Sequence, residues 1–567
     1  MNKSIIFFDV TTKLINPKDE VFIDKKLVEI FIDYDKSIDK ILTNIINENL
    51  VIEEYTNIIL PACFGKVLAD FLGLRFAAHI RCTPGINQHK NIFLYSFNGI
   101  KDYFSSESFN ILKTEGVFLI DYDVNTIINK SLDKIEYLSK EKIINEVKKI
   151  NLQIPANYED NHSIANEWAI YRWSQAINAS DDSIDKITNI QNSNLYFKYL
   201  RTIYPMSKVD IIEDSELKLN FEGNPTILYI DDEADKGWKE IFETLFYEKN
   251  ENIVFFHLDN ELNDKTKKEI SELTIKTIKE KNVDVVILDF RLHKDDFECK
   301  KIEEVTGYQI LKKIKDHNKG IQVIIFSATN KIWNFQALQE AGADGFILKE
   351  SPENSIDFNF TKQSIASLVK TIENRLNMVF LKKVYPIIEN IKKHLINISN
   401  DNGGNGLEEG LMKMKFKNEI FIQLDIIYDC LEKSSLKIST IVEDEHSYLN
   451  LSFISIFKII ELINDFFTDE KGIILKSKNV NVQRYNQNSD TFSQFTGSYP
   501  LTRDKIYSII KFELNDEPKK HVNKLNEYIN FRNNIIHPKT LKEYKKTTKE
   551  ENLKFIQLIE VLILKIN

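Results

Sequence analysis

The sequence has few of the residues that build flexible linkers or covalent cross-links. It contains 17 glycines and 11 prolines in 567 residues, which argues for domains joined by helices rather than by long linkers. The four cysteines are far apart and form no CxxC pair: Cys63, Cys82, Cys299 and Cys430. We therefore expect neither a disulfide framework nor a zinc ribbon. We expect a reducing, cytoplasmic location.

The sequence also lacks long apolar runs and a basic charge excess. The most apolar long stretch, residues 449–463, contains Lys458 and is too short to span a bilayer. The first residues contain no apolar run of signal-peptide length. The net charge of −10 disfavours a general nucleic-acid binder. We expect a protein without a membrane partner.

Four short apolar runs between residues 226 and 349 each end in a polar residue. They read ILYIDD, VVILD, VIIFS and GFILK, with helical segments between them. Such runs are typical of buried parallel strands whose carboxyl ends carry chemistry. Those ends supply three carboxylates, a hydroxyl and an amine: Asp231, Asp232, Asp289, Ser327 and Lys349. The combination predicts a site for a divalent metal ion and a phosphoryl group at one sheet edge.

At these five positions, residues 221–353 resemble the receiver domain of two-component response regulators. The resemblance implies a doubly wound, parallel, five-stranded sheet in which Asp289 accepts a phosphoryl group. It also implies a histidine kinase or a phosphotransfer protein as partner. Mg²⁺ is the implied cofactor, held by four residues: Asp231, Asp232, Asp289 and the main-chain carbonyl of Arg291.

Three further residues have roles that the resemblance implies. Ser327 and Lys349 would bind the phosphoryl oxygens, and Phe346 stands where the family has an aromatic side chain that turns inward on phosphorylation. The chain departs from the family pattern in two places. The segment between Asp289 and Gly307 is long and highly charged, which could reshape access to the site or meet a partner. Pro352 is displaced from its usual place directly after the lysine.

Residues 1–125 alternate between strand-like and helix-like runs, which predicts an α/β domain. Its apolar runs are SIIFF, VEIFI, NIILP, NIFLY and GVFLI. No acidic pair follows the first run and no lysine clearly ends the last, so we expect a degenerate receiver-like fold. Arg75, His79 and Arg81 beside Cys82 either line a ligand pocket or lie on an ordinary surface helix.

Residues 126–220 are predicted to be helical and to couple this domain to the receiver. An aromatic and aliphatic stripe at helical spacing is expected to enter a core or an interdomain contact. Its members are Ile164, Trp168, Tyr171, Trp173 and Ile177. A helical connector is predicted for residues 354–400, with a kink or break at Pro386. The connector either dimerises or packs on its own domain.

Residues 401–567 are predicted to form a helical bundle that contains the segment FRNNIIHP. This segment resembles the R-N-x-x-x-H pattern of HEPN-superfamily ribonucleases. Asn533 and His537 would share a helix face, and Arg532 has the reach to join them. In metal-independent RNA cleavage, His537 would exchange a proton with the 2′-hydroxyl and Arg532 would bind the scissile phosphate. The family resemblance implies a homodimer, and RNA is the implied substrate.

The sequence therefore predicts a response regulator whose receiver controls a C-terminal endoribonuclease. By its domain combination, it resembles bacterial stress or antiviral defence systems. The alternative is a non-catalytic adaptor that uses its helical domain for dimerisation or partner docking. A DNA-binding regulator is disfavoured by the acidic balance and by the lack of a recognition-helix signature.

Overall fold

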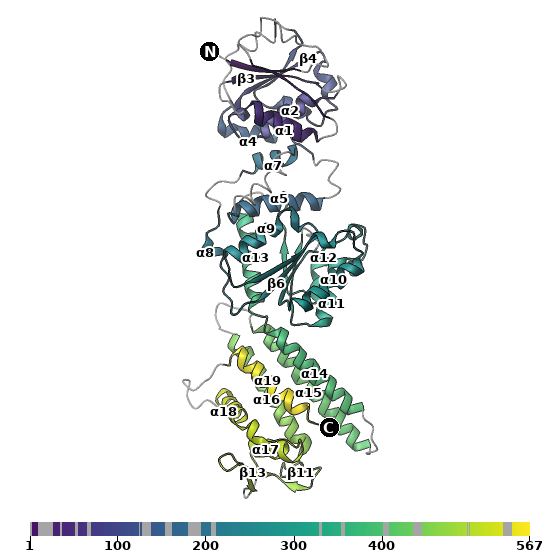
Figure 1. Ribbon diagram of the computed structural model, residues 1–567, viewed down its shortest axis with the longest axis vertical. Coiled ribbons are helices and arrows are strands. Elements are labelled where there is room, and N and C mark those ends of the chain that lie inside the picture. Colours follow the sequence, from purple (N-terminus) through teal and green to yellow (C-terminus); the bar gives the residue numbers. More distant parts are fainter. Residues whose placement is uncertain are drawn as a thin grey trace.

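The protein consists of three parts that follow one another along its longest axis (Figure 1). The computed structural model describes residues 3–8, 26–33, 37–50, 55–64, 70–123, 125–126, 138–153, 161–179, 194–205, 211–327, 332–352, 358–400, 407–434, 445–495, 497, 499–536 and 547–566. Two α/β domains come first, and a helical domain follows them. Within these residues, no helix combines the length and apolar character that a bilayer crossing needs.

The N-terminal domain is built on a parallel sheet of five strands in the order β2-β1-β3-β4-β5. Its strands are β1 (Lys3–Phe8), β2 (Lys26–Glu29), β3 (Tyr55–Pro61), β4 (Asn91–Ser96) and β5 (Val117–Asp121). Four helices pack with it: α1 (Ile38–Asn49), α2 (Leu72–Cys82), α4 (Lys140–Lys148) and α7 (Leu195–Ile203). Each of the five predicted apolar runs contributes to a strand, and the inner strands β1, β3 and β4 bury apolar side chains on both faces, as is usual in parallel sheets.

The central domain repeats this topology, with the order β7-β6-β8-β9-β10. Its strands are β6 (Thr226–Ile230), β7 (Val254–Leu258), β8 (Val285–Leu288), β9 (Gln322–Ser327) and β10 (Gly345–Leu348). Its helices are α9 (Trp238–Glu243), α10 (Lys267–Glu280), α11 (Thr306–His317), α12 (Ile332–Glu340) and α13 (Phe358–Leu376). The predicted doubly wound, parallel, five-stranded sheet is confirmed.

Helix α5 (Asn161–Ala176) joins the two domains by placing aromatic residues in both cores. Trp168 and Tyr171 belong to the core of the N-terminal domain, whereas Trp173 and Ile177 belong to that of the central domain. Trp173 packs edge-on against Trp238, with 5.4 Å between ring centroids. The predicted stripe therefore forms core and interdomain contacts; the side chain of Ile164 lies outside the described residues.

The predicted connector, residues 354–400, contains two helices rather than one helix interrupted at Pro386: α13, which packs in the core of the central domain, and α14 (Leu381–Asn400). The break comes at residues 377–380, and α14 continues through Pro386. Proline has no N–H for the carbonyl four residues before it, which is that of Lys382. Instead, Asn318 of the central domain donates its side-chain amide to this carbonyl at 3.0 Å. The proline thus frees an acceptor that joins α14 to the central domain.

The C-terminal domain packs α14 with five more helices around a single core. They are α15 (Leu407–Lys433), α16 (Glu445–Phe467), α17 (Thr502–Phe512), α18 (Val522–Ile536) and α19 (Lys549–Ile563). Two small antiparallel sheets interrupt the helices, namely β11 (Ile474–Leu475) with β12 (Val480–Asn481), and β13 (Gln483–Asn486) with β14 (Thr491–Gln494). The helical region is confirmed, and these strands were not predicted.

If α5 is an integral part of the central domain, Trp173→Ala should destabilise that domain by about 3–5 kcal/mol, because it removes a fully buried indole. Hydrogen exchange of the β6, β8 and β9 amides measures this loss directly. Ile211→Ala, at an exposed side chain after α5, is the control and should change the value by about 0.5 kcal/mol or less. Equal losses in the two variants would show that α5 contributes nothing to the domain.

Candidate functional site

Three carboxylates meet at the carboxyl edge of the central sheet. Asp231 and Asp232 follow β6, and Asp289 follows β8, the neighbouring strand. One oxygen from each lies within 4.8 Å of the others. Asp231 and Asp289 are fully buried, and Asp232 is partly exposed. Solvent therefore reaches the acidic cluster at Asp232.

Lys349, directly after β10, places a buried ammonium group against these carboxylates. Its Nζ lies 2.8 Å from Oδ2 of Asp231 and 3.8 Å from Oδ1 of Asp289. The rings of Trp238 and Phe326 flank it, with centroids 5.5 and 5.2 Å from Nζ. Buried charges are tolerated when they are paired in this way, so Lys349 and the carboxylates depend on one another.

One cation does not balance three carboxylates, and their pKa values reflect this. Burial raises the pKa of Asp289 well above its ordinary value; Lys349 opposes this shift, and Asp231 and Asp232 add to it. Burial and the charge of Asp231 raise the pKa of Asp232 to about 7. Burial alone would also raise the pKa of Asp231, but the charge and hydrogen bond of Lys349 bring it below its ordinary value. A divalent cation that prefers oxygen ligands, such as Mg²⁺, fits this excess of negative charge.

The other predicted residues lie on neighbouring elements of the same domain. Ser327 is the last residue of β9 and is buried, and its carbonyl accepts the Lys349 N–H at 2.9 Å. Phe346 lies on β10 and is partly exposed. Arg291 follows β8, and its guanidinium lies 4.8 Å from the centroid of the Phe297 ring. The structure thus gathers Asp231, Asp232, Asp289 and Lys349, with Ser327 on the strand beside Lys349.

The charged segment after Asp289 is organised around a buried carboxylate that the sequence did not single out. Asp296 accepts hydrogen bonds from the backbone N–H groups of Leu292 and His293 at 3.0 and 3.1 Å. It also accepts one from the N–H of Thr306, at the start of α11, and lies 2.7 Å from Nζ of Lys267. These bonds fasten the segment to α10 and α11.

Glu350, the residue after Lys349, links the site to α5. Its carboxylate is fully buried and lies 3.3 Å from Nε of Arg172. Trp173 donates its indole N–H to the same carboxylate at 3.2 Å, and the hydroxyl of Thr361 on α13 donates to it at 2.8 Å. The signal in the sequence was an acidic residue, Glu350, at the place directly after the lysine that proline usually holds in the receiver family. The sequence did not reveal its partner, because Arg172 lies 178 residues earlier in the chain.

The N-terminal sheet has different residues at the matching positions. The Gly73 N–H bonds the Ala62 carbonyl at 3.0 Å, as the Gly307 N–H bonds the Phe290 carbonyl at 3.1 Å in the central domain. Pro61 therefore takes the position of Asp289. The Tyr122 N–H bonds the Ser96 carbonyl at 2.8 Å, so Tyr122 takes the position of Lys349. A proline has no carboxylate, so the residue at the position of Asp289 cannot accept a phosphoryl group.

The polar residues of α2 are not on a surface helix, because ten of its eleven residues are buried. Arg75 forms two hydrogen bonds to Asp39, at 2.6 and 2.9 Å, and His79 lies 3.0 Å from the same carboxylate. Arg81 is fully buried and donates to main-chain carbonyls, including those of Gln88 and Lys90. Arg75 therefore joins α2 to α1, and Arg81 joins α2 to the segment before β4.

Two family models match the chain. One, described as an inactive receiver domain, matches residues 10–120. The other, the response regulator receiver domain, matches residues 259–357. The chain holds two receiver-type domains. Pro61 and Tyr122 give a physical reason why the first is of the inactive type.

The match to the second receiver contains Asp289, Ser327 and Lys349 and begins after Asp231 and Asp232. Two strands of the sheet, β6 and β7, precede the match, and both belong to the same sheet because β6 pairs with β7 and with β8. Neither match extends into the C-terminal helical domain. No curated protein matches the chain.

In the C-terminal domain, Arg532 and Asn533 lie in the last turns of α18, and His537 lies outside the described residues. Nη1 of Arg532 donates to Oδ1 of Asn533 at 3.3 Å, and its Nη2 lies 3.5 Å from Oε1 of Glu461 on α16. The guanidinium also lies 5.3 Å from the centroid of the Phe457 ring. Asn533 is exposed, so this pair faces solvent beside α16.

The affinity of the three carboxylates for Mg²⁺ should increase as the pH rises past about 7. The raised pKa values mean that the native receiver holds protons on Asp232 and Asp289 that the unfolded chain has released. These two groups therefore make the metal-free receiver less stable as pH rises from about 4 to about 7. Mg²⁺ competes with the protons, so a calorimetric Mg²⁺ titration should give weaker binding at pH 6 than at pH 8.

Asp232→Asn, which cannot titrate, is the matched variant for this measurement. It should bind Mg²⁺ more weakly and with a smaller change between the two pH values. Equal Mg²⁺ affinity of the wild type at pH 6 and pH 8 would contradict a metal site at these carboxylates.

Proposed function

We propose that the second receiver is a phosphorylation switch in which Asp289 accepts a phosphoryl group from a histidine kinase or a phosphotransfer protein. The observation that supports it best is the convergence of three carboxylates and Lys349 at the carboxyl edge of a receiver-type sheet. A carboxylate accepts phosphate only where the charge of the incoming group is neutralised, and this edge has the residues for that.

In this proposal each residue has a defined task. An oxygen of Asp289 attacks phosphorus, and the bond between phosphorus and the donor nitrogen breaks, returning the electron pair to the imidazole. Asp231, Asp232, Asp289 and the carbonyl of Arg291 would hold Mg²⁺, which would supply positive charge beside the phosphoryl oxygens. Lys349 moves its ion pair from the carboxylates to one phosphoryl oxygen, and Ser327 donates a hydrogen bond to another.

The movement of Lys349 would also affect the helices that connect the receiver to the domains before and after it. Lys349 is followed by Glu350, whose carboxylate is bonded to Arg172 on α5 and Thr361 on α13. Phe346 lies three residues before Lys349 on the same strand end. We propose that Phe346 turns inward when Lys349 moves, and that α13 passes the change to α14.

Asp289→Asn should take up no phosphoryl group from a small acyl phosphate in the presence of Mg²⁺, because the amide is not a nucleophile for this transfer. Phosphate-affinity electrophoresis or intact mass measures the modification in the full chain. Asp295→Asn changes an exposed carboxylate in the charged segment after Asp289 and should leave the uptake unchanged. Equal labelling of wild type and Asp289→Asn would place the phosphoryl group elsewhere.

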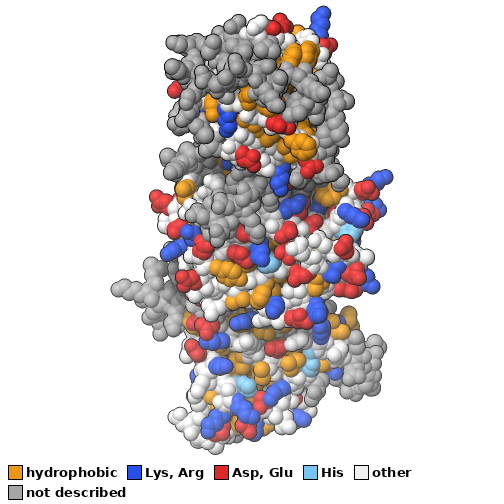
Figure 2. Space-filling view, turned by 45° about the horizontal axis from the view of Figure 1, so that its top comes forward, with side chains coloured by type: hydrophobic (Ala, Val, Ile, Leu, Met, Phe, Trp, Pro, Cys, Tyr) orange, Lys and Arg blue, Asp and Glu red, His pale blue; other side chains and the backbone are white. Residues whose placement is uncertain are grey.

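A second proposal is that the C-terminal domain is an endoribonuclease controlled by this switch. What supports it is the R-N-x-x-x-H pattern together with the exposed pair of Arg532 and Asn533 at the end of α18, directly before His537 in the chain. In a homodimer, two such motifs would meet at one cleft. Figure 2 shows acidic and basic side chains interspersed over the coloured part of the visible face, without a large basic patch there.

His537→Ala should lower RNA cleavage by about 100-fold or more, since it removes the general acid or base. Arg532→Gln should also lower it, through loss of the contact to phosphate. Lys524→Ala removes an exposed cation from the same helix and should keep full activity. Cleavage of a fluorescent RNA, with and without phosphodonor, is the measurement. A wild-type protein that cuts no RNA in either state would favour the adaptor function and leave the phosphorylation proposal untouched.

A further inference from the structure

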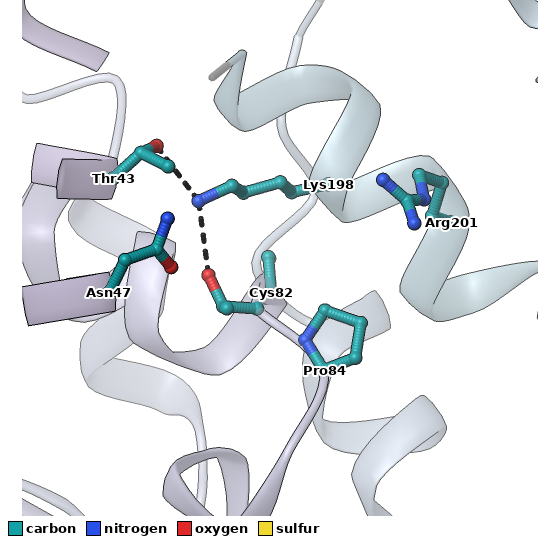
Figure 3. Close-up of a pocket in the computed structure, with 7 residues that line it drawn as sticks. Thr43, Asn47, Cys82, Pro84, Lys198 and Arg201 are labelled. Carbon is teal, nitrogen blue, oxygen red and sulfur yellow. Dashed lines mark hydrogen bonds between the residues drawn. The ribbon is translucent and has the colours of Figure 1, made fainter. Parts of the chain in front are cut away.

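A pocket of about 210 Å³ opens in the N-terminal domain between α1, the end of α2 and α7 (Figure 3). It is lined by Thr43, Asn47, Cys82, Thr83, Pro84, Lys198 and Arg201. Asn47 and Pro84 are exposed at its mouth, whereas Lys198 is buried. The pocket thus leads from solvent to a buried amine.

Among the described residues, the lining contains two cationic side chains and no acidic one. Nζ of Lys198 donates to Oγ1 of Thr43 at 2.9 Å and to Oγ1 of Thr83 at 3.1 Å, as the dashed lines in Figure 3 indicate. Its third neighbour is Nδ1 of His79, at 3.4 Å. Burial lowers the pKa of His79 to about 4, so this imidazole is neutral. Among the described residues, every hydrogen-bond partner of Lys198 is therefore uncharged.

The nearest acidic residue in this region has other partners. Asp39 is bonded by the guanidinium of Arg75, by His79 and by the N–H of Leu195. Burial lowers the pKa of Lys198 to about 8; Cys82 and the charge of Asp39 oppose this shift, and Arg201 adds to it. A buried ammonium group that has no carboxylate in direct contact is unfavourable, and an anion in the adjacent space stabilises it.

We propose that this pocket binds a small anion of the phosphate class, either inorganic phosphate or a compact phosphomonoester. Lys198 and Arg201 supply two positive charges, which match the charge of about −1.5 to −2 that a phosphomonoester carries at pH 7. Guanidinium and ammonium groups are the side chains that bind phosphate oxygens best, and the Asn47 amide adds a donor at the mouth. The volume lies below the roughly 300–1,000 Å³ of pockets for drug-sized ligands, so the anion is small.

Calorimetric titration of the full chain with inorganic phosphate tests the proposal. EDTA is present, so that no metal ion supports phosphate at Asp289. Glycerol phosphate is titrated in parallel to distinguish a phosphomonoester from free phosphate, and succinate serves as a dianion without phosphorus. We expect binding of at least one phosphate compound, more tightly than of succinate, and weaker binding at higher salt.

Two variants locate the site. Lys198→Met and Arg201→Gln should each weaken phosphate binding at least tenfold, whereas Lys40→Met, at an exposed lysine on α1, should leave it unchanged. If Lys198→Met does not fold, Arg201→Gln decides the question, because Arg201 is partly exposed. The proposal is overturned if neither phosphate compound binds, if succinate binds equally well, or if the folded pocket variants bind like the wild type.

Discussion

The central receiver depends on two successive buried charges of opposite sign, Lys349 and Glu350. Lys349 faces the acidic cluster, and Glu350 pairs with Arg172 on the helix that joins the two receivers. A buried ion pair is held only when its geometry is good, and removing one partner leaves an uncompensated charge. The end of β10 therefore fixes both the phosphoacceptor edge and the position of α5.

The two receiver-type domains share one topology and differ in what occupies the carboxyl edge of the sheet. The central edge holds charges that a metal ion and a phosphoryl group could rebalance. The N-terminal edge has Pro61 and Tyr122 at the matching positions, and Tyr122 packs 3.9 Å from the centroid of the Phe97 ring. Aromatic packing takes the place of charge there, and two cationic residues of this domain, Lys198 and Arg201, line the pocket by α7 instead.

Much of the central domain could be predicted from the sequence. A local apolar run marks each strand, and in a parallel sheet the polar residue after each run lies at the same edge. Asp231, Asp289 and Lys349 were found in this way. Contacts between distant segments could not be predicted, since nothing near Arg172 indicates that its partner is Glu350. The break at 377–380 was likewise missed, because the effect of Pro386 depends on the Asn318 side chain that bonds the freed carbonyl. The N-terminal strands were predicted, but the pocket of Lys198 depends on three helices that meet only in the folded domain.

The attachment of α14 has a mechanical consequence. Asn318 and Asp284 hold Lys382 at the amino-terminal edge of the central sheet, on the side opposite Asp289. Gly320 lies so close that an added Cβ would meet the Leu381 backbone at 2.2 Å. From this point of attachment, α14 extends for 20 residues, or about 30 Å, into the core of the C-terminal domain. A tilt of about 5° at this point would move the far end by roughly 2.5 Å. A small rearrangement in the receiver would therefore be amplified along α14 into a larger displacement of the helical domain.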